Sequence, residues 1–188
     1  MTNGLDYWQL TAVVLGPAVV YAAYIDWLHH RVPNWLTASI AAAGLVAQVL
    51  WGQGLLQGVG GLLVGFGLLI VPWAMHGMGA GDVKLMAAIG AWFGPWMTLM
   101  AFCTGALIGG VVAVGMILWS GKTREAMANL ATISYKLTHR EVMFTDFGSA
   151  KGFGSTSQLL PYGVPLTIGS LAILAIQMTS GWPLGVGI

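Results

Sequence analysis

Four stretches of this chain contain no Asp, Glu, Lys or Arg, and their lengths constrain the fold more than any other feature. They cover residues 7–25, 32–81, 85–121 and 152–188. A helix needs about 20 mostly apolar residues to cross a bilayer. The second stretch has room for two such helices, with a break at Gly52-Gln53-Gly54. The third is too long for one helix, and Phe93-Gly94-Pro95 is its natural break.

We therefore predict an all-α polytopic membrane protein with six transmembrane helices, forming a single integral-membrane domain over residues 1–188. The helices are expected near residues 7–27, 35–51, 55–75, 82–94, 96–119 and 161–180. The fourth is short, so either Asp82 sits below the membrane surface or this helix is tilted. We find no internal sequence repeat, which argues against an inverted-repeat transporter.

The positions of the basic residues support the count of six. With six helices, the loops 28–34, 76–84 and 120–160 share one side of the membrane. All seven basic residues fall in these loops: Arg31, Lys84, Lys122, Arg124, Lys136, Arg140 and Lys151. Because loops rich in Lys and Arg stay in the cytoplasm, we expect this side to be cytoplasmic and both termini to lie outside. No basic segment precedes the first helix, so we do not expect a cleaved signal peptide.

Composition excludes several classes of function. The chain is 57% hydrophobic and 7% charged, whereas a soluble domain carries about 25% charged residues, so a soluble enzyme is excluded. A net charge of +1 predicts no nucleic acid partner, and the lipid bilayer is the expected surrounding. The single cysteine, Cys103, can form neither an internal disulfide nor a four-cysteine zinc site. We expect it to be a buried small residue.

The segment 120–160 is the only long polar stretch. Apolar residues recur in it at nearly helical spacing, at positions 127, 130, 133 and 137, and Lys136 and Arg140 lie one turn apart. This pattern predicts an amphipathic helix on the cytoplasmic leaflet, with a solvated loop as the alternative.

Two of the six acidic residues stand at the ends of predicted membrane helices. Asp26 ends the first helix and Asp82 opens the fourth, so both face the same side of the membrane. A carboxylate at the hydrocarbon boundary is costly unless it is paired, protonated or hydrated, which makes each a candidate functional residue. The alternative is that each marks a helix end among the headgroups. The other four acids are expected to be surface charges: Asp6, Glu125, Glu141 and Asp146.

Polar residues and glycines surround both aspartates. Asp26 precedes the segment WLHHRVPNWLT, and Asp82 lies in GMGAGDVKL. Gly79 and Gly81 leave the backbone room for a substrate strand to approach Asp82. Lys84 is expected to point away from Asp82 on a helix, and either to reach the interface or to neutralise charge nearby.

These motifs resemble a known family. D-x4-R-V-P-N-x-L-T together with G-x-G-D-V-K-L resembles the type IV prepilin peptidases, GxGD-type aspartic proteases of the bacterial inner membrane. The segment P-Y-G-V-P-L-T-I-G, from Pro161 to Gly169, is similar to the last membrane helix of that family. The resemblance covers nearly the whole chain, and in size the chain most resembles the short members that serve Tad/Flp-type pili.

The resemblance implies a membrane-embedded aspartic endopeptidase that removes the leader peptide of a prepilin substrate at the cytoplasmic membrane face. It implies Asp26 and Asp82 as the catalytic residues. Whether such an enzyme acts alone or docked to a pilus or secretion assembly complex stays open. Longer relatives carry a cytoplasmic region with paired Cys-x-x-Cys motifs, associated with N-methylation, and this sequence has neither. The resemblance therefore does not extend to methyltransferase activity.

Peptide hydrolysis by two carboxylates needs one protonated group, one ionised group and a water between them. Like charges so close cannot both ionise easily, so the pair titrates as a unit. The helix N-terminus favours Asp82 as the anion, whereas Asp26, near a helix C-terminus, is favoured as the acid. This chemistry requires no metal and no cofactor.

The other polar residues near the pair are less specific. Arg31 and Asn34 either order the loop or bind the substrate backbone, and Pro33 is expected to fix the turn into the second helix. Three histidines are expected to be interfacial polar residues: His29, His30 and His76.

Three other interpretations stay open. A presenilin-like or signal-peptide-peptidase-like intramembrane protease shares G-x-G-D, but its partner Asp lies inside a membrane helix. A small proton-coupled transporter that uses the Asp pair would carry its acids at mid-span, usually with repeat symmetry. An inactive assembly subunit of a secretion system would carry the same motifs without turnover.

Overall fold

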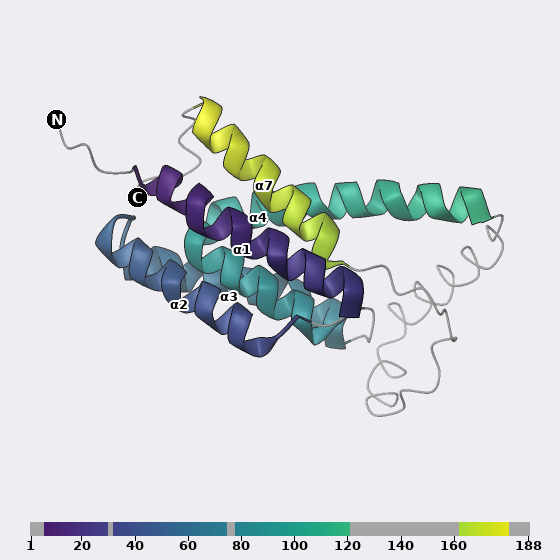
Figure 1. Cartoon of the computed structure of the whole chain (residues 1–188), viewed down its shortest axis with the longest axis horizontal. Helices are drawn as coiled ribbons and strands as arrows, with labels where there is room; N and C mark the ends of the chain where they lie inside the picture. Colours follow the sequence, from purple (N-terminus) through teal and green to yellow (C-terminus); the bar gives the residue numbers. More distant parts are fainter. Residues whose placement is uncertain (1–5, 30–31, 75–77, 121–161, 181–188) are drawn as a thin grey trace. The chain divides into compact units, whose positions relative to one another are not determined.

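The computed structural model describes residues 6–29, 32–74, 78–120 and 162–180, and these residues are helical apart from short connections. The helices, shown in Figure 1, are α1 (Tyr7–His29), α2 (Asn34–Leu50), α3 (Leu55–Ala74), α4 (Ala80–Ser120) and α7 (Gly163–Ser180). The predicted all-α fold is confirmed for the described part of the chain.

Contacts divide the chain into two units, one made of Met1–Gly109 and Pro161–Ile188 and the other of Gly110–Leu160. The packing described below belongs to the first unit. Only the last turns of α4 are described in the second unit, so the single domain over residues 1–188 stays a prediction.

Three of the helices are long and apolar enough to cross a membrane. They are Tyr7–Leu28, Leu55–Ala74 and Ala80–Trp119, and the apolar helices Asn34–Leu50 and Gly163–Thr179 are shorter. The helices begin and end within a few residues of the predicted ones. The single helix α4 covers both the fourth and the fifth predicted helices, 82–94 and 96–119. The count of six spans and the cytoplasmic face stay predictions. The amphipathic helix predicted in 120–160 lies outside the described residues.

The long helix α4 is interrupted where the sequence predicted a break. Gly94 has φ 75° and ψ 173°, a conformation that is essentially restricted to glycine, and Pro95 has no N–H with which to continue the helical ladder. The carbonyl oxygen of Trp92, next to this break, accepts hydrogen bonds from the Tyr7 hydroxyl and from Gln48 Nε2, the latter at 2.9 Å. Side chains of α1 and α2 thus satisfy the backbone where α4 changes direction.

Glycines let α3 and α4 approach each other closely. A Cβ added at Gly61 would lie 2.0 Å from the carbonyl oxygen of Gly90, and one at Gly65 would lie 2.4 Å from that of Met86. No side chain fits between the backbones at these positions. Small residues commonly mediate such contacts between membrane helices, where lipid provides little hydrophobic drive for association.

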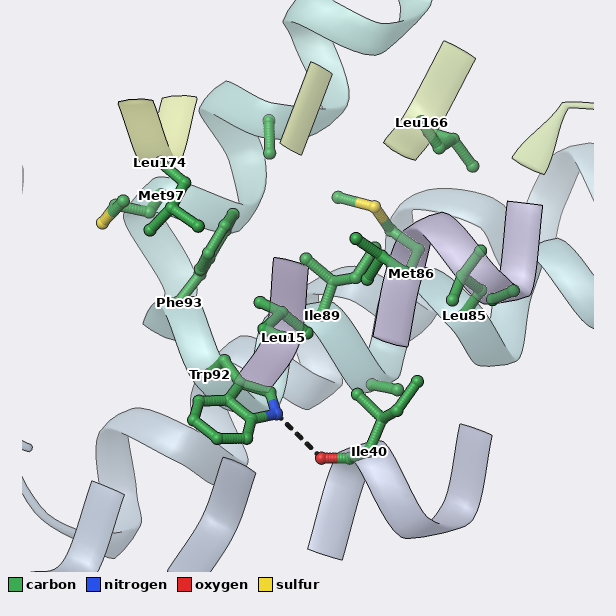
Figure 2. Packing of buried hydrophobic residues seen from close by; sticks show 14 of the residues in the cluster. Leu15, Ile40, Leu85, Met86, Ile89, Trp92, Phe93, Met97, Leu166 and Leu174 are labelled. Carbon is green, nitrogen blue, oxygen red and sulfur yellow. Dashed lines mark hydrogen bonds between the residues drawn. The ribbon is translucent and has the colours of Figure 1, made fainter. Parts of the chain in front are cut away.

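The hydrophobic core of the first unit is built around the first half of α4 (Figure 2). Its fully buried members on this helix include Leu85, Met86, Ile89 and Trp92. Figure 2 also shows Trp92 Nε1 donating a hydrogen bond of 2.9 Å to the Ile40 carbonyl of α2. This bond satisfies the one polar atom that the indole carries into the core.

Many outward-facing side chains are large and apolar. Trp27, Trp35 and Trp51 are exposed at helix ends, as expected for residues that anchor helices at a membrane interface. Cys103 is also exposed, so the prediction that it is buried is wrong. It lies on a helix whose outer face is apolar, which is why the pattern of its neighbours could not distinguish core from surface.

Packing brings four helix ends together at one end of the first unit. α1 and α7 lie side by side (Figure 1), and α2 contacts both α1 and α3. The C-terminal end of α1 and the first turns of α2, α4 and α7 therefore carry residues that meet, although they are far apart in the sequence.

Candidate active site

Both aspartates singled out by the sequence lie at this end of the first unit, and both are buried. Asp26 lies in the last turn of α1 and is 6% exposed, and Asp82 lies in the first turn of α4 and is 5% exposed. The Asp82 N–H donates to the Gly79 carbonyl at 3.2 Å, which starts the helix. Burial of two carboxyl groups is costly in any protein and suggests a functional reason for keeping them.

The two carboxyl groups converge on the first residue of α7. A Cβ added at Gly163 would lie 2.7 Å from Asp26 Oδ2 and 3.4 Å from Asp82 Oδ1. Because a single point lies so near to both oxygens, the carboxyl groups are close neighbours. Two oxygens in this arrangement can hold one water molecule between them, as paired carboxylates do in aspartic proteases.

The surroundings of Asp82 act on its charge in opposite directions: burial and the charge of Asp26 disfavour the anion, and backbone hydrogen bonds favour it. Its carboxylate interacts with the backbone N–H groups of Gly79 and Gly163 and with the charge of Asp26. The Oδ1 atom is buried and accepts no hydrogen bond from the residues that the structure describes. Two carboxylates this close repel each other as anions, so one proton shared by the pair lowers the free energy.

The connector between α1 and α2 packs against the start of α4. A Cβ added at Gly81 would lie 3.2 Å from the Val32 nitrogen and 3.3 Å from its Cβ. The space beside Gly81 is therefore filled by Val32, which the sequence analysis did not single out. A Cβ at Gly79 would lie 3.5 Å from Asp82 Oδ2, an ordinary contact distance. That a substrate strand approaches Asp82 beside Gly79 stays a prediction.

Lys84 and Asn34 form a second link between the same elements. Lys84 Nζ donates a hydrogen bond of 2.9 Å to Asn34 Oδ1 at the surface. This bond links the start of α4 to the first residue of α2, directly after the connector. Pro33 precedes α2 with φ −62° and ψ 136°, which agrees with the turn expected there. The side chains of His29, His30, Arg31 and His76 lie outside the described part of the structure.

Gly163, like Val32, is a residue of this site that the sequence analysis missed. It lies in the segment P-Y-G-V-P, which resembled the last membrane helix of the prepilin peptidases, but nothing in the sequence linked it to the aspartates. Among the described residues, no three His, Cys, Asp or Glu side chains gather in a way that could hold a metal ion.

Known proteins match the region of this chain that contains both aspartate motifs. A sequence profile of the type IV leader peptidase family matches residues 13–114, a range that includes both aspartates. The prepilin leader peptidase/N-methyltransferase of Aeromonas hydrophila is 32% identical over 130 residues, which cover 63% of this chain and 43% of that protein. No solved structure matches the chain.

Two further relatives carry the same name. That of Escherichia coli strain K12 is 34% identical over 115 residues, covering 54% of this chain and 51% of the relative. That of Dichelobacter nodosus is 31% identical over 119 residues, covering 59% of this chain and 42% of the relative. The chain thus spans about half the length of the curated relatives it matches.

Proposed function

Because this chain belongs to the type IV leader peptidase family, we propose that it is an integral membrane endopeptidase that removes the leader peptide of a type IV-like prepilin. The observation that carries the proposal is the convergence of the Asp26 and Asp82 carboxyl groups on Gly163. It provides the two acids that aspartic catalysis requires.

The proposed reaction uses one ionised and one protonated carboxyl group. Asp82, at the N-terminal end of α4 and near two backbone N–H groups, is the ionised base, and Asp26 is the acid. Asp82 takes a proton from the bound water as the water oxygen attacks the scissile carbonyl carbon, and Asp26 protonates the carbonyl oxygen. The tetrahedral intermediate then collapses: its hydroxyl proton returns to Asp26, Asp82 passes its proton to the amide nitrogen, and the C–N bond breaks.

The position of the pair at helix ends suits a substrate that emerges from the membrane. A scissile peptide must be extended to expose its carbonyl, whereas the hydrophobic segment of a prepilin is helical in lipid, because its backbone groups have no other partners there. We propose that cleavage occurs where that helix ends, at the cytoplasmic face of the bacterial inner membrane. We propose Tad/Flp-type prepilins as the substrates.

The proposal extends only the peptidase activity to this chain. The names of the relatives also include an N-methyltransferase activity, but the chain spans about half of their length and has one cysteine. Whether the enzyme acts alone or within a pilus or secretion assembly complex does not affect the chemistry proposed here.

The test is cleavage of prepilins encoded in the same genome. The chain is purified in detergent, mixed with each candidate prepilin, and loss of the leader is followed by gel shift and by the mass of the product. We expect one new amino terminus just before the hydrophobic segment. The proposal would be contradicted if the folded enzyme cleaved none of the candidates. Cleavage deep within the hydrophobic segment would also contradict it.

A further inference from the structure

We infer that Gly163 is a positioning residue for the carboxyl pair, so that the first turn of α7 forms a third element of the active site. Because this residue has no side chain, Asp26 and Asp82 can face a shared space beside its Cα atom. The inference rests on the proposed peptidase function and adds a residue that neither of the recognised aspartate motifs contains.

The distances at Gly163 leave no space for a side chain while both carboxyl groups keep their places. A Cβ there would lie 2.7 Å from Asp26 Oδ2 and 3.2 Å from Asp26 Cγ, and Cβ atoms essentially never approach other atoms closer than 3.0 Å. The atom in the way is the end of a side chain. An added methyl group would therefore turn the Asp26 carboxyl aside, while the backbone of α7 stayed in place.

The polarity of the surroundings indicates what the shared space holds. Asp26 and Asp82 are both more than nine-tenths buried, and Asp82 Oδ1 accepts no hydrogen bond from the described residues. Buried carboxylate oxygens bind donors wherever the space permits. A water molecule fits this need, and the same position serves the attack on a peptide carbonyl.

A second glycine on the same helix shows what a purely structural role looks like. A Cβ at Gly169 would lie 2.4 Å from the Gly105 nitrogen and 2.7 Å from the Ala101 carbonyl oxygen. Both of these atoms belong to the backbone of α4, so a substitution there separates two helices. At Gly163 the obstacle is a catalytic side chain, and the two glycines should therefore respond differently to the same change.

Alanine is conformationally acceptable at position 163. Among the described glycines, positive φ angles occur only at Gly54 and Gly94, and alanine is favoured over glycine in a helix. Gly163→Ala should therefore fold as well as the unmodified enzyme. This separates an effect on catalysis from an effect on stability.

The experiment compares Gly163→Ala, Gly169→Ala and Gly67→Ala, measuring kcat, KM and Tm of each purified variant with a prepilin substrate. A Cβ at Gly67 meets nothing within 4 Å, so this variant is the control. For Gly163→Ala we expect an unchanged Tm, an unchanged KM and a fall in kcat of about 100-fold, the size of effect that follows a small misplacement of catalytic groups. Gly169→Ala should instead lower Tm.

The pH profile of kcat provides a readout that a packing defect would not change. In the unmodified enzyme each carboxyl group shifts the titration of the other, which widens the pH range of activity. Gly163→Ala separates the groups, so this range should become narrower. Full kcat in Gly163→Ala, an unchanged pH range, or a loss of Tm like that of Gly169→Ala would each overturn the inference.

An Asp82→Asn variant in the same series separates the inference about Gly163 from the proposed peptidase function. If Asp82→Asn abolishes cleavage while Gly163→Ala keeps it in full, only the inference about Gly163 fails. If Asp82→Asn itself keeps full activity, the proposed function fails as well.

Discussion

Asn34 and Lys84 lie 50 positions apart in the sequence and share a hydrogen bond of 2.9 Å at the protein surface. Because the bond is exposed, we expect Asn34→Ala or Lys84→Met to lower the free energy of unfolding by less than about 1 kcal/mol. The bond holds the connector that follows Asp26, so each change should still reduce cleavage. The double variant should be no worse than the more damaging single one. Losses that add up in the double variant would show that the two residues act separately.

Gly81 packs against Val32 of the same connector. An added methyl group needs a shift of only a few tenths of an ångström there, whereas a branched side chain needs the connector to move. We expect Gly81→Ala to keep most of the cleavage activity and Gly81→Val to lose most of it, with normal insertion of both. Prepilin cleavage and membrane fractionation of each variant measure the two effects. Equal activity of the two variants would contradict this account of the contact.

The residues of the site differ in how far the sequence reveals them. Asp26 and Asp82 stand out because a charge at the end of an apolar helix is rare and costly, and the motifs around them identify the family. Gly163 is one of 28 glycines, and its place becomes visible only when α7 packs against α1 and α4. Val32 is missed for the same reason, since an apolar residue in a connector carries no local signal of what it contacts.

At the scale of the helices, the break in α4 needs a residue that accepts a positive φ at position 94. Gly94 has a φ of 75°, and a side chain there would also approach the Gln57 Oε1 atom at 3.2 Å. We expect Gly94→Ala to lower the free energy of unfolding by about 1–3 kcal/mol, and Gly67→Ala, on an exposed face of α3, to leave it unchanged or slightly higher. Denaturation in detergent measures both. Equal stability of the two variants would show that the break does not need glycine.

Helix positions were largely predictable because long apolar stretches and turn residues mark where membrane helices begin and end. Pro95 and Gly94 predicted the break in α4, and Gly52-Gln53-Gly54 predicted the turn before α3, where Gly54 has a φ of 100°. The contact partners were not predictable. The close approach of Gly61 to Gly90 depends on which faces two apolar helices present to each other, and periodicity does not distinguish these faces when lipid surrounds the protein.

For the whole molecule, the positions of the basic residues predict its orientation in the membrane. We expect single cysteines at positions 53 and 186 to react with an impermeant reagent from outside, and those at 31 and 122 to react only after permeabilisation. The background should carry Cys103→Ser, because Cys103 is exposed. Labelling of position 31 from outside would contradict the predicted cytoplasmic location of the loop 28–34.

The central claim is that Asp26 and Asp82 act together on one peptide bond, and the direct measurement compares Asp26→Ala, Asp82→Ala and the double variant. Residues that act as a unit give non-additive losses. We predict that each single variant loses at least about 100-fold in the rate of prepilin cleavage and falls to the same background as the double variant, with an unchanged amount in the membrane. Asp6→Asn, at an exposed helix start, should stay active. Near-normal cleavage by either single variant, or a double variant much slower than both, would contradict the account.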